Sequence, residues 1–223
     1  MAKPYWIRTD KSGGDGSTQV NVSVENFDGR IQRSGILTVT SAAPTKTVTV
    51  VQKGAGNIIN APNAPAFSKE VITYNIVGTS NAKRLSFDLE EGTDEIGITL
   101  PESYIVNDSI SVSNNEYISN DPGSSGLYTF NIQISVASPD LENLTKDSTA
   151  KMFIRAYNDD PIIDGQEPDH LEDYTVEIIL LQSAQSPFLD ITVNGVSITE
   201  LVFENTETTK TIQVSSNVSW TIS

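Results

Sequence analysis

Apolar and polar residues alternate in short runs along most of this chain. The clearest run is Tyr128, Phe130, Ile132, Ile134 and Val136, whose side chains share one face of an extended segment. The other runs are also short, and Gly, Asn, Asp and Pro residues separate them, as expected for turns. The pattern predicts an all-β protein built from β-sandwich modules.

The middle of the chain has enough runs for one complete module, and we expect a β-sandwich over residues 66–184. Its predicted strands lie at 71–77, 85–89, 96–100, 110–112, 127–136, 152–157 and 174–181. Residues 55–65 combine Pro62 and Pro65 with small residues, and this composition predicts a linker. Residues 1–54 form a separate group of short predicted strands.

The last 37 residues, 187–223, carry the strongest hairpin signal. Asn194 and Gly195 are flanked by apolar runs, and this dipeptide suits a two-residue type I′ turn. The closing run alternates through Val218, Trp220 and Ile222. A segment this short cannot bury a core of its own, so we expect another part of the protein to cover it.

Composition excludes several kinds of functional site. The chain has no Cys and a single His, His170, which excludes disulfides and leaves little room for zinc binding or His-based catalysis. The carboxylate pairs Glu90-Glu91 and Asp94-Glu95 are adjacent rather than facing, unlike the pair a glycosidase needs. No nucleotide-binding or nucleophile motif is present. We therefore predict a protein that is not an enzyme and has no catalytic residue or cofactor.

The formal net charge is −15, and the charge is unevenly distributed. Residues 1–53 carry +3, residues 54–186 carry −15 and residues 187–223 carry −3. An acidic middle repels phosphate backbones, so we expect no nucleic-acid partner. No apolar run approaches the length of a membrane span, and the first ten residues lack the apolar core of a signal peptide. We expect a cytoplasmic start and no membrane partner.

One acidic stretch, 158–174, is the only candidate for a metal site. Its oxygen-bearing side chains resemble ligands that Ca²⁺ accepts, but their spacing does not match an EF-hand. A solvated acidic loop is the simpler interpretation, and we predict no metal site. The calcium candidates within the stretch are Asp159, Asp160, Asp164 and Asp169.

The first and middle groups of predicted strands end alike, in β-runs that close on Gln at 48–52 and 176–182. This similarity suggests related modules. The N-terminal residues resemble the later part of a BACON module, an Ig-like domain of gut Bacteroidetes proteins that also occurs in phages infecting these bacteria. The matching residues are Trp6-Ile7, Ser12-Gly13-Gly14, residues 20–26, Arg33-Ser34-Gly35 and Val50-Val51-Gln52.

The C-terminal residues 217–223, Asn-Val-Ser-Trp-Thr-Ile-Ser, are similar to the opening part of the same module, so its order is inverted here. We hypothesise that residues 1–54 and 187–223 together form one sandwich, with a shared core of Trp6, Ile7, Val218, Trp220 and Ile222. Three arrangements are open. The segments close within one chain, which a high effective concentration favours; they join neighbouring copies; or each stands alone.

The resemblance implies that the modules are Ig-like β-sandwiches, and the middle module at 66–184 shares this Ig-like style. We expect a phage virion protein, a capsid decoration or auxiliary protein assembled in the host cytoplasm, whose partners are other capsid proteins and copies of itself. This expectation rests on analogy with the fold. The alternative is a carbohydrate-binding module on a bacterial cell surface, in which Tyr5, Trp6 and Trp220 would stack on a glycan. Their place in alternating strands favours a core role for the two Trp residues.

Overall fold

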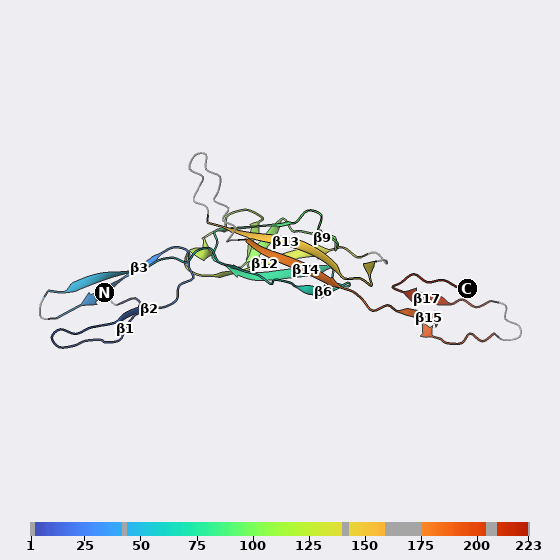
Figure 1. Cartoon of the computed structure of the whole chain (residues 1–223), viewed down its shortest axis with the longest axis horizontal. Helices are drawn as coiled ribbons and strands as arrows, with labels where there is room; N and C mark the ends of the chain where they lie inside the picture. The colour runs from blue at the N-terminus through green and yellow to red at the C-terminus, as the bar shows by residue number, and fades with distance from the viewer. Residues whose placement is uncertain (1–2, 42–43, 140–142, 159–174, 204–208, 223) are drawn as a thin grey trace, which may run out of the picture.

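The computed structural model describes residues 3–41, 44–139, 143–158, 175–203 and 209–222, and it confirms that the chain is all-β. Three parts follow one another along an elongated molecule (Figure 1). We call residues 3–54 the N-terminal segment, residues 55–186 the middle sandwich and residues 187–222 the C-terminal segment. The described chain contains a short 3-10 turn, η1, at Pro122–Ser124.

The middle sandwich has two sheets. The first has the order β11-β10-β12-β7-β5, and β9 also pairs with β12. Its strands are β5 (Ile59–Asn60), β7 (Thr73–Ser80), β9 (Ile98–Thr99), β10 (Ser103–Val106), β11 (Ile110–Ser113) and β12 (Tyr128–Val136). The second has the order β6-β14-β13-β8, with strands β6 (Ala66–Ser68), β8 (Arg84–Leu89), β13 (Ser148–Tyr157) and β14 (Thr175–Ser183).

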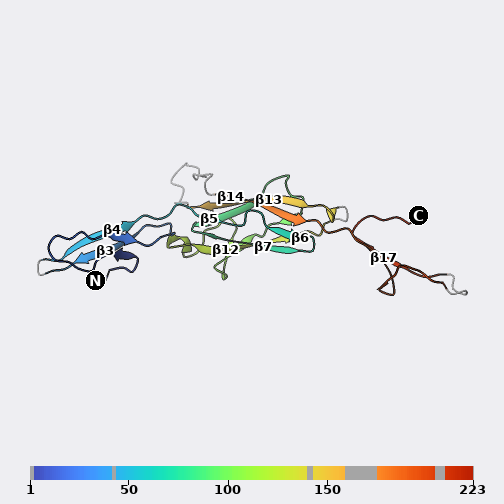
Figure 2. The same ribbon diagram turned by 60° about the horizontal axis from the view of Figure 1, so that its bottom comes forward.

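One apolar core lies between these two sheets, which Figure 2 shows as layers. Alternate residues of β12 point into it, and Ile132 and Ile134 are fully buried, as the alternation predicts. Aromatic rings meet across the two sheets. Phe87 of β8 lies edge-on to Tyr104 of β10, with 6.0 Å between the ring centroids. The ring centroids of Phe67 in β6 and Tyr74 in β7 are 5.0 Å apart. The middle sandwich thus buries its own core.

The predicted linker at 55–65 is more ordered than its composition suggests. It contributes β5, whose residues Ile59 and Asn60 pair with Ser80 and Thr79 of β7. The buried side chain of Asn81 holds the preceding residues, because its Oδ1 accepts a hydrogen bond from the Ile58 amide at 2.7 Å. A contact so distant in sequence overrides the local preference for an irregular chain.

The terminal segments contain short sheets. The N-terminal segment has two antiparallel pairs, formed by β1 (Ile7–Thr9) with β2 (Val22–Val24) and by β3 (Arg33–Val39) with β4 (Lys46–Gln52). The C-terminal segment has one sheet of β15 (Leu189–Val193), β16 (Val196–Ser197) and β17 (Gln213–Ser216). Its predicted hairpin is confirmed, since Asn194 and Gly195 both have positive φ between the paired residues Val193 and Val196.

The two terminal segments lie at opposite ends of the molecule (Figures 1 and 2). The arrangement favoured by effective concentration, closure within one chain, is therefore not the one this structure adopts. The cause is the path through the middle sandwich. The chain enters beside the end of β7, where Ile59 pairs with Ser80, and leaves at the opposite end, where Ser183 of β14 pairs with Ser68 of β6.

Burial of Tyr104 predicts a pH effect on stability. Desolvation raises the pKa of the Tyr104 phenol from 10.0 to about 12. Between these values the phenol ionises in the unfolded chain but stays neutral in the folded one. The contribution of the neutral Tyr104 phenol to stability is therefore complete below pH 10. Above pH 10, the free energy of unfolding falls by about 1.4 kcal/mol per pH unit. Urea denaturation across this range should give a shallower decline for Tyr104→Phe, and equal slopes would contradict the assignment.

Candidate functional site

The candidate site is a pair of apolar surfaces, one on each terminal segment. Large apolar side chains are exposed on both. In the N-terminal segment they include Val20, Val22, Val24, Val48 and Val51, and in the C-terminal segment Leu201, Val202, Phe203, Trp220 and Ile222. The positions in β2 fall at every second residue, so they share a sheet face that the protein would ordinarily bury.

The N-terminal segment has a small core centred on Arg33. The Arg33 guanidinium lies between two aromatic rings, 4.5 Å from the centroid of Trp6 and 4.3 Å from that of Phe27. Its Nε donates to Gln52 Oε1 at 2.9 Å, which ties the stack to the end of β4. Ile7 is buried close to Gly35, where an added Cβ would come within 2.9 Å of its side chain. This core covers Trp6 and Ile7 but leaves the β2 valines exposed.

A polar joint fixes the N-terminal segment to the middle sandwich. Arg30 forms an ion pair with Asp121, and its backbone amide donates to the Gly123 carbonyl at 3.0 Å. The buried Asn81 donates through Nδ2 to the carbonyls of Asp28 and Gly56, each at 2.9 Å. The joint holds Asp28 and Arg30 of the segment and also Gly56, which follows the segment in the chain. It therefore sets the direction in which the segment projects.

In the C-terminal segment, Ser216 and Asn217 hold the start of β15. Asn217 is buried; its Oδ1 accepts from the Phe188 amide at 2.8 Å, and its Nδ2 donates to the Ser186 carbonyl at 3.0 Å. Ser216 Oγ donates to the Phe188 carbonyl at 2.9 Å and accepts from the Val218 amide at 3.0 Å. We call this set of four hydrogen bonds the Ser-Asn clamp.

The middle sandwich contains the same clamp. Asn81 Oδ1 accepts from Ile58 and its Nδ2 donates to Gly56. Ser80 Oγ donates to the Ile58 carbonyl at 2.7 Å and accepts from the Ala82 amide at 3.0 Å. All four bonds of the Ser216-Asn217 clamp therefore recur. The clamp was not predicted from the sequence, although a Ser-Asn step ends an alternating run at both places.

The structure places the residues of the predicted shared core in two groups. Trp6 and Ile7 are buried in the N-terminal segment, whereas Trp220 and Ile222 are exposed in the C-terminal segment, with Val218 half-buried beside them. One chain does not bring the groups together. Of the suggested sugar platform, Trp6 is buried, while Tyr5 and Trp220 are exposed. The calcium candidates Asp159, Asp160, Asp164 and Asp169 lie outside the described residues.

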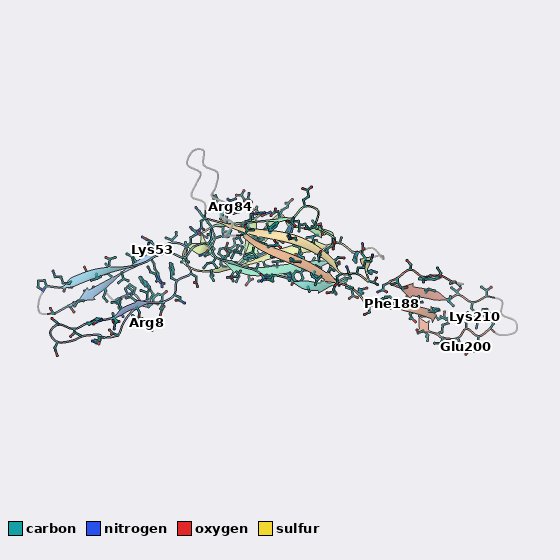
Figure 3. All side chains as sticks on the ribbon, viewed as in Figure 1. Arg8, Lys53, Arg84, Phe188, Glu200 and Lys210 are labelled. Atoms are coloured by element: carbon teal, nitrogen blue, oxygen red, sulfur yellow. The ribbon has the colours of Figure 1, made fainter. Side chains whose placement is uncertain are left out.

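Charge differs between the two surfaces. Residues 1–53 hold seven Lys and Arg against four Asp and Glu, and residues 187–223 hold one against four. Figure 3 shows Arg8 and Lys53 on one terminal segment and Glu200 on the other. Opposite net charges steer such surfaces towards each other and would disfavour contacts between two like ends.

Among the described residues, no group of three or more His, Asp or Glu side chains is placed to hold a metal ion. The described residues also include no helix with the length and apolar character needed to cross a membrane. No protein-family model matches this chain, and no curated protein matches it. Among the described residues, the terminal segments expose apolar strands that pair on one edge only, and such strands can add to another sheet.

Removing the Asn side chain from either clamp should affect only the part of the protein that contains that clamp. Asn81→Ala should lower the free energy of unfolding of the middle sandwich by about 3 kcal/mol, because it leaves the Ile58 amide and two carbonyls without their partner. Asn217→Ala should leave that value unchanged but speed hydrogen exchange at the Phe188 amide. Urea denaturation and exchange on dilute protein measure both. A comparable loss of stability in Asn217→Ala would show that the clamps do not act locally.

Proposed function

We propose that this chain is a non-enzymatic structural protein of a bacteriophage virion, a decoration or auxiliary protein of the capsid. The observation that carries the proposal is the exposed apolar surface at each end of an elongated molecule. A self-contained binding domain buries its strands, as the middle sandwich does, whereas a component of an assembly keeps surfaces for its neighbours. The resemblance to modules found in phages of gut bacteria supports the same role.

Two features of the chain suit this role. The middle sandwich has a complete core and acts as a rigid spacer. The Arg30–Asp121 joint and the buried Asn81 hold one terminal segment in a fixed direction from it. A decoration protein needs such rigidity, because it must place its contact surfaces at distances set by the capsid.

Immunogold labelling tests the proposal directly. Antibodies raised against the purified chain should decorate the capsids of virions from a phage that encodes it, and peptides of the chain should appear in purified virions by mass spectrometry. A phage-encoded non-structural protein from the same lysate provides the control. If the chain stays in the soluble fraction of the lysate with that control, the virion role is wrong.

A second candidate function, glycan binding at a bacterial cell surface, is favoured by the exposed aromatic rings of Tyr5 and Trp220, which are 81% and 46% exposed. On a glycan array, this function predicts binding that Tyr5→Ala or Trp220→Ala lowers by about tenfold or more. Tyr117→Ala, at another exposed ring, is the matched control. Absence of glycan binding by the unaltered chain would exclude the candidate.

A further inference from the structure

The middle sandwich is a complete example of the module that each terminal segment represents in part. The C-terminal segment matches its opening strands. The two Ser-Asn clamps align Ser216 with Ser80. With this alignment the strand pairing is also the same, because Leu189 faces Ser216 as Ile59 faces Ser80. The same alignment places Phe203 at the position of Phe67 in β6, and Lys210 at that of Tyr74.

The N-terminal segment matches the later strands. Ile7 pairs with Val24 as Ile98 pairs with Val136, and the Glu25 amide donates to the Trp6 carbonyl at 3.0 Å as Ala137 donates to Gly97. The last two strands also agree. β3 and β4 form an antiparallel pair in which Arg33 faces Gln52, and β13 and β14 form one in which Ser148 faces Gln182.

The matched positions differ in burial. Apolar residues that the middle sandwich buries have exposed counterparts in the terminal segments. Ile132, Ile134, Val136, Ile178 and Phe67 are 0%, 0%, 5%, 0% and 7% exposed, whereas Val20, Val22, Val24, Val48 and Phe203 are 43%, 45%, 42%, 55% and 47% exposed. Each terminal segment therefore lacks the part of the module that the other segment contains.

The strand edges show the same complementarity. In the middle sandwich, β12 pairs with β7, and β14 pairs in parallel with β6. In the part of the chain that the structure describes, β2 pairs with β1 alone and β4 with β3 alone, so their second edges have no strand. The missing neighbours, the equivalents of β7 and β6, are β17 and the run Leu201–Phe203 of the C-terminal segment.

We infer that the C-terminal segment of one copy completes the N-terminal segment of a second copy, forming a sandwich arranged like the middle one. A second copy is the natural partner because the two surfaces lie at opposite ends of one chain, carry opposite net charge and match one module between them. The contact is head to tail. Copies therefore join into an open filament, or into a ring if their rotation closes. The inference goes beyond the virion role and does not depend on it.

The register of the middle sandwich predicts which residues meet. Ile132 of β12 faces Ile76 of β7, so Val20 of one copy should face Ile212 of the next. Partners in an antiparallel pair lie close enough for a disulfide, and the natural chain has no Cys to interfere. Mixing a Val20→Cys chain with an Ile212→Cys chain restricts any mixed disulfide to contacts between copies.

Under mild oxidation this mixture should give at least about 10-fold more cross-linked dimer than a control mixture of Val20→Cys with Val77→Cys. Val77 lies on the outer face of β7 and is more exposed than the half-buried Ile212, so accessibility alone would favour the control mixture. Equal yields in the two mixtures would overturn the inference. So would a double variant, Val20→Cys with Ile212→Cys, that cross-links only within single chains.

Sedimentation of the full chain provides the second test. The unaltered protein should associate in a concentration-dependent way, and Phe203→Asp should weaken association at least about 100-fold, because the charge would enter the core at the position of Phe67. Phe203 is half-exposed in the single chain, so the variant should keep its fold by circular dichroism. Val77→Asp should associate normally. A chain that stays monomeric at every concentration would overturn the inference.

Discussion

A β-sheet in water must bury one apolar face and protect its edges, and this structure depends on how far each of its parts meets that requirement. The middle sandwich meets it, because its two sheets enclose a common core of buried side chains. The terminal segments do not. The valines at positions 20, 22 and 24 alternate as core residues do, and yet these valines and Phe203 remain exposed. The exposed face is therefore the surface at which we propose that the protein binds its partner.

The direction of the chain through the middle sandwich suits the assembly between copies that we propose. β5 begins at one end of the sandwich and β14 finishes at the other, so the terminal segments project apart (Figure 1). Asn81 and the Arg30–Asp121 pair anchor the N-terminal segment at its end. Two apolar surfaces at opposite ends of the molecule favour contacts between copies over closure of one copy on itself.

Features with a local cause could be predicted from the sequence. The alternation of β12 and the Asn194-Gly195 turn each follow from residues next to one another in the chain, and both are confirmed. The strand β5 was not predicted, because Asn81 holds it from a distance in sequence. The opposite placement of the terminal segments was not predicted either, since it depends on the complete path of the sandwich. The apolar surfaces were visible as patterns, but their exposure was not.

The most direct measurement is hydrogen exchange at adjacent amides of the N-terminal segment as protein concentration rises. The Glu25 amide donates to Trp6 within its own segment, while alternation directs the amides of Val22 and Val24 to the free edge of β2. At the matched position, the Val136 amide donates to Ile72 at 2.9 Å. We expect Val22 and Val24 to become protected on association while Glu25 is protected throughout. Exchange at Val22 and Val24 that is equally fast at every concentration would contradict the account.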